Sequence, residues 1–271
     1  MCTVTYLPWR DGFILTHNRD EAPTRSPWHI SREKRGSDTL IFPKDIKAGG
    51  GWVAAARSGR VACLLNGAFL KHQHQPPYRR SRGLVLLDFF DWPHPDDFFI
   101  RYDLEGIEPF TFLFFSAGRV AELRWDGAQR HLHDLSHTEP HFWCSATLYP
   151  PPMQALREQV FRQWLARHYT LSAATLPSTV HRPPSTIHRP PSTVHRLPST
   201  VHRLHETGSV GDPENDYVMN RSGRVCTVSI TQILFRERQI RMRYSELLEG
   251  HWDRKQLSLA ERQSPLSARS K

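Results

Sequence analysis

Short apolar segments occur in pairs along the chain, and turn residues separate the two members of each pair. The segments are rich in β-branched and aromatic residues, a composition typical of β-strands. The pairs are residues 2–7 with 13–17, 52–56 with 60–65, and 225–235 with 239–247. The run from 110 to 135 adds three more strands, because turn residues interrupt it twice. The sequence therefore predicts antiparallel hairpins.

Helical periodicity appears only between these predicted strands. The segments 81–92 and 96–104 are predicted helices, and Ser81 is a plausible N-cap for the first. Residues 153–169 form a longer predicted helix. Its apolar face comprises Leu156, Val160, Phe161, Trp164 and Leu165. Hairpins that flank central helices indicate an α+β fold rather than a doubly wound parallel sheet.

A seven-residue unit of the type PSTVHRP occurs four times between residues 177 and 204. Such a period is typical of coiled coils, but a proline at every seventh residue forbids a continuous helix. We therefore expect a disordered linker at 177–204. It interrupts a single domain spanning 1–252, and a basic tail follows at 253–271. The four histidines of the repeats could collect a metal ion, but a flexible chain offers no preformed site, so we predict no metal centre.

A net charge of +9 is typical of proteins that bind nucleic acids, but most of this charge lies in two segments of the chain. The repeats hold four arginines and no acid, and residues 254–271 hold five basic residues against Glu261. The remainder carries a net charge of only +1, so we expect no nucleic-acid partner.

Other broad features favour a protein that works inside the cell. No apolar run approaches the roughly 20 residues that cross a bilayer, and the first residues lack the basic start and unbroken apolar stretch that mark a signal peptide. We therefore expect a cytoplasmic protein without integral membrane association. The four cysteines stand far apart, and Cys63 and Cys226 are expected to be buried, inert thiols. The sequence leaves the oligomeric state open.

Cys2 differs from the other cysteines because it follows the initiator methionine. Removal of Met1 would leave a thiol and a free α-amine on one residue, that is, a nucleophile with its own base. The second strand should return Arg19 and Asp20 beside Cys2. We expect Arg19 to lower the pKa of the thiol, Asp20 to orient the amine, and Asn18 to donate to an oxyanion. The alternative is an exposed polar turn whose salt links are worth under about 1 kcal/mol.

Several motifs together resemble one known family. They are MCTVTYLP, the tetrad Asn18-Arg19-Asp20-Glu21, the stretch Gly49–Trp52 with the hairpin that ends at Asn66, and the segments 143–150 and 224–235. These motifs resemble the NRDE family, also called the transport and Golgi organisation family. The resemblance implies an αββα sandwich, in which helices cover two antiparallel sheets as in N-terminal-nucleophile hydrolases.

The resemblance implies two functions of different class. In the cysteine branch of those hydrolases an N-terminal cysteine attacks an amide, so Cys2, Arg19 and Asp20 become catalytic candidates, with Asn18 and Asn66 as helpers. No cofactor is then required, and the partner is a small amide. Members of the family are also associated with haem movement, so the alternative is a carrier with haem as cargo and Cys2 or a histidine as axial ligand. A third hypothesis is a scaffold whose partners bind the basic linker.

Five further residues are expected to help bind the ligand: Glu21, Gly50, Gly51, Trp52 and Ser145. Relatives usually carry Leu-Ser-Asn-Ala-Thr before the long helix, and here Ser145 replaces that asparagine. If the asparagine supplies an oxyanion donor, its loss can cost roughly 2.7–4 kcal/mol. His72 and His74 stand two residues apart and are expected to lie in a surface loop, with metal or haem ligation as the alternative.

Overall fold

A computed structural model describes residues 2–169 and 193–259. The first of its two antiparallel sheets contains both ends of the described chain and has the strand order β10-β1-β2-β12-β13-β14. A short strand, β11, also pairs with β12. The bounds are β1 (Cys2–Trp9), β2 (Gly12–Glu21), β10 (His141–Cys144), β11 (Asn220–Arg221), β12 (Val225–Arg236), β13 (Gln239–Glu246) and β14 (Trp252–Ser258).

The second sheet is a meander in which strands β3 to β9 follow one another in chain order. Its bounds are β3 (Ile30–Arg35), β4 (Asp38–Pro43), β5 (Val53–Ala56), β6 (Val61–Asn66), β7 (Phe110–Ser116), β8 (Arg119–Trp125) and β9 (Arg130–Leu135). The predicted strands at 52–56 and 60–65 and the three predicted within 110–135 are confirmed in this sheet. Those predicted at 225–235 and 239–247 are confirmed as β12 and β13 of the first sheet. The hairpin β3–β4 was not predicted, because five of the six residues of β3, all except Ile30, are polar or charged and its apolar signal is weak.

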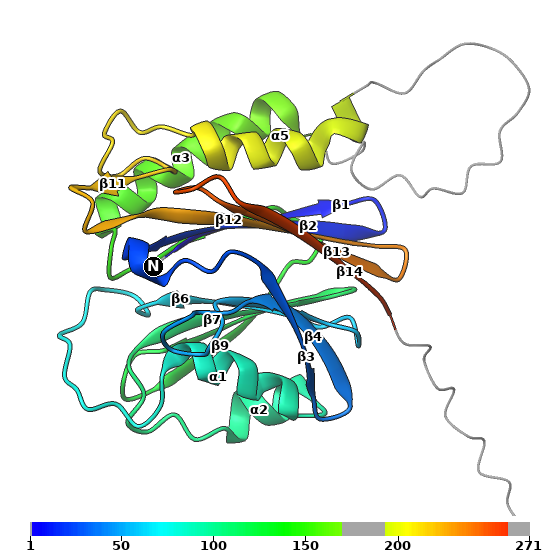
Figure 1. The fold of residues 1–271 in the computed structure, drawn as a ribbon, viewed down its shortest axis with the longest axis vertical. Helices are drawn as coiled ribbons and strands as arrows, with labels where there is room; N and C mark the ends of the chain where they lie inside the picture. Colours follow the sequence, from blue (N-terminus) through cyan, green and yellow to red (C-terminus); the bar gives the residue numbers. More distant parts are fainter. Residues whose placement is uncertain (1, 170–192, 260–271) are drawn as a thin grey trace, which may run out of the picture.

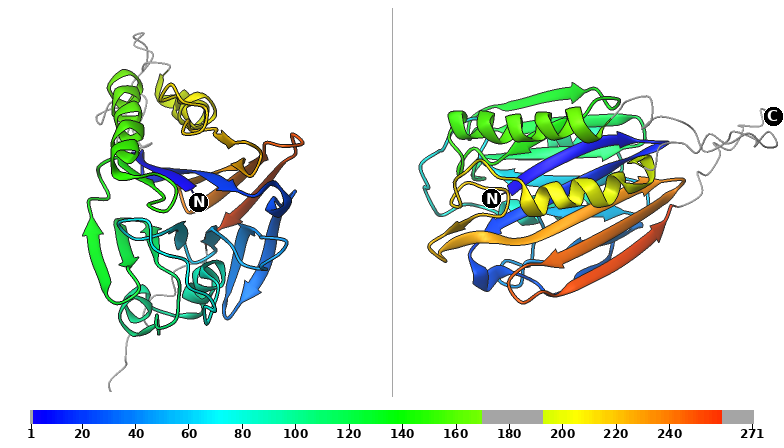
Figure 2. Two further views of the ribbon diagram at one scale, coloured as in Figure 1. Left: turned by 90° about the vertical axis from the view of Figure 1, so that its left-hand side faces the viewer. Right: turned by 90° about the horizontal axis from the view of Figure 1, so that it is seen from above.

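Helices cover the outer faces of both sheets (Figure 1; Figure 2). Helices α3 (Pro151–His168) and α5 (Thr193–Thr207) lie over the first sheet. Helices α1 (Arg82–Asp88) and α2 (Pro95–Arg101), with the 3-10 turn η2 (Phe89–Asp91) between them, lie under the second. A further 3-10 turn, η1 (Pro23–Arg25), follows β2. The predicted αββα sandwich is confirmed.

The hairpin β1–β2 is buried on both faces, and this property places its polar residues inside the molecule. Val4 and Tyr6 face the second sheet and belong to the core between the sheets. Leu7 and Ile14 face the helices and pack with Phe161 of α3. Side chains alternate between the faces of a strand, so each polar residue near Cys2 must also enter one of these two layers.

The long helix α3 departs from its predicted face at one position. Phe161 and Trp164 are buried as expected, but Leu156 is 38% exposed. Its neighbour Arg157 is fully buried instead. Polar contacts with the start of β1, described below, hold this arginine inside.

Helix α5 corrects the prediction of a disordered linker at 177–204. Residues 193–204 are helical, and Pro198 lies inside the helix. Leu197, Val201 and Leu204 follow the i, i+4, i+7 spacing of a helix face and are buried against the first sheet. Burial of this apolar stripe outweighs the hydrogen bond that proline removes. The rest of the predicted linker up to residue 192 lies outside the described residues.

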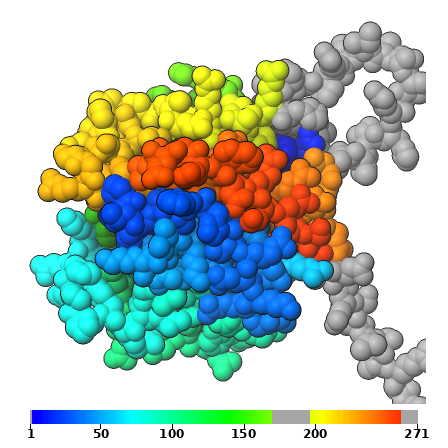
Figure 3. Space-filling model, in the orientation of Figure 1, coloured from blue at the N-terminus to red at the C-terminus, as the bar shows by residue number. Residues whose placement is uncertain are grey.

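Strand β14 corrects the predicted boundary of the tail at 253. Residues 252–258 pair with β13, and Leu257 is only 3% exposed. The folded domain therefore extends through Ser258, and residues 260–271 lie outside the described residues. Within 2–169 and 193–259, the helices are too short or too polar to span a membrane. Figure 3 shows orange-red residues near the carboxyl end against blue residues near the start of β3, where the backbone N–H of Ile30 donates to Asp253 Oδ2 at 2.9 Å.

Candidate functional site

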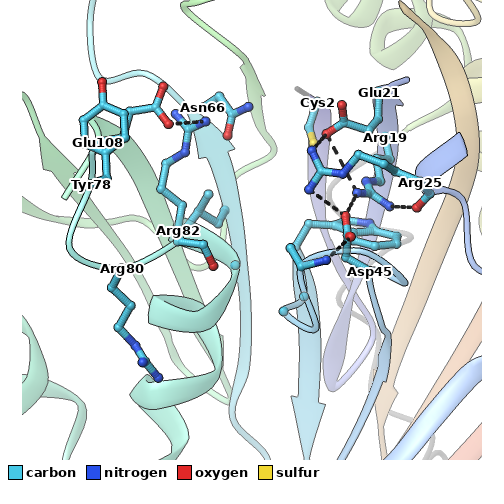
Figure 4. Close-up of a pocket in the computed structure, with 17 residues that line it drawn as sticks. Cys2, Arg19, Glu21, Arg25, Asp45, Asn66, Tyr78, Arg80, Arg82 and Glu108 are labelled. Atoms are coloured by element: carbon cyan, nitrogen blue, oxygen red, sulfur yellow. Dashed lines mark hydrogen bonds and ion pairs between the residues drawn. The ribbon is translucent and has the colours of Figure 1, made fainter. Parts of the chain in front are cut away.

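A cavity of about 400 Å³ opens at the end of the sandwich where β1 begins. Seven of the predicted site residues line it: Cys2, Arg19, Glu21, Gly50, Gly51, Trp52 and Asn66. They come from the hairpin β1–β2, from the loop before β5 and from the end of β6. Figure 4 shows Cys2, Arg19 and Glu21 on one wall and Asn66 on the other. Three predicted residues, Asn18, Asp20 and Ser145, lie outside this lining.

The four residues Asn18–Glu21 lie on two different faces of the first sheet, because they form part of strand β2. Cys2 lies directly opposite Arg19 in the ladder between β1 and β2. Opposed residues of an antiparallel pair share a face, and successive residues alternate between faces. Arg19 and Glu21 therefore accompany Cys2 on the inner face, whereas Asn18 and Asp20 lie on the outer face toward the helices.

Asn18 cannot serve as the predicted oxyanion donor, because its side-chain amide is fully used on the outer face. Its Nδ2 donates to the backbone carbonyls of His205 at 2.9 Å and Tyr217 at 2.8 Å. Its Oδ1 lies 2.5 Å from Nδ1 of His205. The other ring nitrogen of His205 contacts Oγ1 of Thr5 at 2.8 Å. Asn18 thus fastens helix α5 to the first two strands.

Asp20 is a fully buried carboxylate that accepts two side-chain hydrogen bonds. Tyr149 donates from its hydroxyl at 2.9 Å and Thr227 from Oγ1 at 2.7 Å. Burial raises the pKa of Asp20, while the positive charge of Arg157 acts in the opposite direction. Asp20 does not line the cavity, but its charge still reaches Cys2 through the strand.

Arg19 is held rigidly in the cavity wall. Its Nη2 pairs with the carboxylate of Asp45, and its Nη1 donates to the carbonyl of Arg25 at 2.9 Å. The guanidinium lies 3.7 Å from the ring centroid of Trp52, a cation–π contact. Glu21 Oε2 forms a longer ion pair with the same Nη2, at 3.8 Å. Arg19 therefore supplies a fixed positive charge across from Cys2.

The surroundings of Cys2 favour the protonated thiol over the thiolate. Its side chain is 2% exposed, and burial raises the pKa of the thiol. The amino-terminal charge and Arg19 lower this pKa and Asp20 raises it further. The predicted effect of Arg19 has the right sign, but burial outweighs it. A base is therefore needed before the sulfur can act as a nucleophile.

Apart from Asn66, the residues of the wall opposite Cys2 were not predicted as part of the site. Arg82 of α1 pairs with Glu108 at 2.9 Å, and Arg80 pairs with Asp88. Tyr78 lines the cavity beside them. The run Tyr78-Arg79-Arg80-Ser81-Arg82 before a helix was the available signal. Its residues are far from the tetrad in sequence, so only the fold brings them to Cys2.

Asn66 is the amide that remains available at the cavity. Its side chain makes no hydrogen bond to the described part of the chain, while its backbone carbonyl accepts from Ser145 Oγ at 2.8 Å. The backbone N–H of Ser145 donates to the carbonyl of Cys2 at 2.9 Å. Ser145 thus supports the backbones of both cavity residues, and it lies outside the cavity lining.

Glycine residues allow the cavity wall to approach helix α1. A Cβ on Gly50 would lie 2.5 Å from the backbone carbon of Gly83, and the N–H of Gly51 donates to the carbonyl of Gly83 at 3.1 Å. These two glycines therefore allow a close backbone contact with α1. Trp52 belongs to the core between the sheets and also lines the cavity.

The histidine pair in the loop before α1 has a protein partner. His72 Nε2 lies 2.9 Å and His74 Nδ1 3.3 Å from the same oxygen of Glu108. Across the described residues, no group of three histidine, cysteine or acidic side chains is arranged to hold a metal ion. His181 and His188 of the repeats lie outside those residues.

Comparison with known proteins identifies the family and the fold. The model of the family described as transport and Golgi organisation 2 matches residues 1–246. No curated protein matches the chain.

Two solved structures resemble the fold at low sequence identity. Penicillin V acylase from Agrobacterium tumefaciens has a TM-score of 0.55 and 9% identity, with 94% of this chain and 85% of that chain covered. The N-acylethanolamine-hydrolyzing acid amidase orthologue from Caenorhabditis elegans has a TM-score of 0.53 and 10% identity, with 86% and 92% covered. At such identities these likenesses establish the fold alone.

Proposed function

The chain belongs to the transport and Golgi organisation 2 family and has an N-terminal-nucleophile-hydrolase fold, and from this premise we propose that it hydrolyses a small amide with Cys2 as nucleophile. One observation carries the proposal: the thiol at the start of β1 lines the cavity. The similar structures are named as an acylase and an amidase, which supports an amide as the substrate class.

The proposed reaction has two steps. After loss of Met1, the α-amine of Cys2 takes the thiol proton, and the sulfur bonds to the amide carbon. That proton passes to the departing amine, which leaves a thioester on Cys2. Water then attacks the thioester, releases the carboxylic acid and restores the thiol.

The cavity residues support the charges that these steps generate. Arg19 faces Cys2 in the ladder and favours the thiolate over the thiol. The side-chain amide of Asn66, which has no partner among the described residues, is the candidate donor to the oxyanion. Arg19 stays in place during the reaction because Asp45 and Trp52 hold its guanidinium.

Mass spectrometry of the intact protein, followed by iodoacetamide labelling and peptide mapping, tests the nucleophile. We expect loss of Met1 and faster labelling of Cys2 than of Cys63, which is fully buried and outside the cavity lining. Cys2→Ala should abolish amide hydrolysis across a panel of N-acyl amides, whereas Cys63→Ala should leave it intact. Retained Met1, or hydrolysis that survives Cys2→Ala, would contradict the proposal.

Haem carriage is the competing hypothesis. Cys2 and Tyr78 are the cavity-lining residues whose side-chain types can ligate haem iron. A haem titration followed by the Soret band distinguishes the two functions. Stoichiometric binding that Cys2→Ala removes, together with no hydrolysis by the wild type, would favour the carrier.

A further inference from the structure

Arg157 is an arginine buried without a directly paired carboxylate. Its exposed fraction is 0%, and no acidic oxygen among the described residues lies within 4.0 Å of its guanidinium. Its Nη2 donates to Oγ1 of Thr3, and its Nη1 donates to the carbonyls of Asn215 and, at 2.8 Å, Asp216. Burying a charge is costly, so this placement requires a compensating charge nearby.

Asp20 supplies that charge through a tyrosine. The guanidinium of Arg157 lies 4.1 Å from the ring centroid of Tyr149, and the hydroxyl of the same tyrosine donates to Asp20 at 2.9 Å. Arg157 is the cation whose charge most favours the ionised form of Asp20. The arginine, the tyrosine and the aspartate thus form one charge-balanced network on the outer face of the first sheet.

This network adjoins Cys2 from the side opposite the cavity. Thr3, which Arg157 binds, is the next residue after Cys2, and Asp20 follows Arg19, which pairs with Cys2 in the ladder. Tyr149 also donates its backbone N–H to the carbonyl of Ser145, and Ser145 donates to the carbonyl of Cys2. The outer face therefore holds the backbone around the thiol and sets part of its electric field.

We propose that Arg157 is a positioning residue for Cys2, which holds Thr3 in place and offsets the negative charge of Asp20 at the thiol. The inference rests on the proposed function, in which Cys2 is the nucleophile. It adds a residue outside the cavity to that site. The amino-acid sequence does not reveal this role, because Arg157 occupies one of the polar positions of an amphipathic helix.

The electrostatic part predicts a specific order of thiol reactivities. Asp20 disfavours the thiolate of Cys2. Arg157 keeps Asp20 ionised and places a positive charge against Tyr149, the residue that donates to Asp20. Arg157→Met leaves that negative charge without its counter-charge and should therefore slow iodoacetamide labelling of Cys2 at pH 7 by a factor of about 3–10. Asp20→Asn alone should speed labelling. The double variant should return to near the wild-type rate, because both opposing charges are gone.

Two further variants separate charge from packing. Arg157→Lys keeps the positive charge and should label within about 2-fold of the wild type if charge is the cause. Arg162→Met removes an exposed arginine from the same helix and should change nothing. Circular dichroism and thermal melting establish that each variant is folded at the labelling temperature.

Labelling is measured without amide turnover, so the two proposals can fail separately. Absence of Cys2-dependent hydrolysis in the wild type would remove the proposed function and leave the labelling order intact. An unchanged rate in Arg157→Met, or a slow double variant, would overturn the role of Arg157. If Arg157→Met does not fold, Asp20→Asn decides the question, because an unchanged rate in that variant would also overturn it.

Discussion

Arg19 and Asp20 are adjacent, yet β2 places them in two different environments. On the inner face, Arg19 borders a cavity whose opposite wall carries Arg82, Glu108 and an amide with no partner among the described residues. On the outer face, Asp20 and Asn18 are sealed under α3 and α5, and their side-chain oxygens are engaged by hydroxyls and an imidazole. The outer face is built to hold the strands together, and the inner face leaves groups free to meet a ligand.

The largest expected effect tests the holding role of the outer face. Asp20→Ala leaves Arg157 as an uncompensated buried charge and removes the acceptor for Tyr149 and Thr227. We expect a loss of about 3–5 kcal/mol in the free energy of unfolding, measured by urea denaturation. Glu21→Ala, on the inner face and paired with the part-exposed Arg25, should cost less than about 1 kcal/mol. Equal losses of unfolding free energy in the two variants would show that the two faces of β2 contribute alike to stability.

Acid should lower the free energy of unfolding, because a neutral histidine is buried on each face of the first sheet. Burial lowers the pKa of His17 on the inner face to about 3 and lowers that of His205 on the outer face. The unfolded chain takes up a proton near pH 6.5 and the folded chain does not, so stability falls as pH drops below 6.5 and is unaffected above it. His17 alone should cost about 2.3 kcal/mol between pH 6.5 and pH 4.5. Urea midpoints of the wild type and of His17→Gln, which removes the contribution of His17 to this slope, provide the measurement.

Breaking the contacts between α5 and the hairpin β1–β2 should lower the free energy of unfolding by an intermediate amount. His205→Ala removes the partners of Asn18 Oδ1 and Thr5 Oγ1 in a buried layer. We expect a cost of about 1–3 kcal/mol in unfolding free energy, with hydrogen exchange faster in α5 than in α3. Thr207→Ala, at an exposed position of the same helix, is the control. Uniformly faster exchange throughout the domain would instead indicate that α5 does not open separately.

The smallest expected effect on stability belongs to the inner face. Asn66→Ala removes an amide that has no side-chain partner among the described residues, so the free energy of unfolding should change by less than about 0.5 kcal/mol. If Asn66 is the oxyanion donor, the same variant should lower kcat of amide hydrolysis about 10²–10³-fold. If Asn66→Ala hydrolyses the amide at the wild-type rate, a group other than Asn66 donates to the oxyanion.

Local patterns predicted the parts of the fold in which apolar residues are concentrated. The hairpins β1–β2, β5–β6 and β12–β13 and the helix α3 follow this rule. The charged strand β3 and the proline-containing helix α5 do not, because pairing and burial by distant residues decide their structure. The same limit applies to the site. Pairing placed Arg19 opposite Cys2, but Arg82, Glu108 and Arg157 reach Cys2 only through the tertiary fold.

Helix α5 also bears on how this chain can change over generations. The units 191–197 and 198–204 are identical, and the buried residues of the helix lie in the last unit, at the end of the one before it and just after the repeats. Tandem duplication or deletion of whole units would change the chain upstream of these anchoring contacts. Such events would alter the spacing between α3 and α5 while leaving the docked helix in register. The gene can therefore gain or lose length at this point without a matching change elsewhere in the domain.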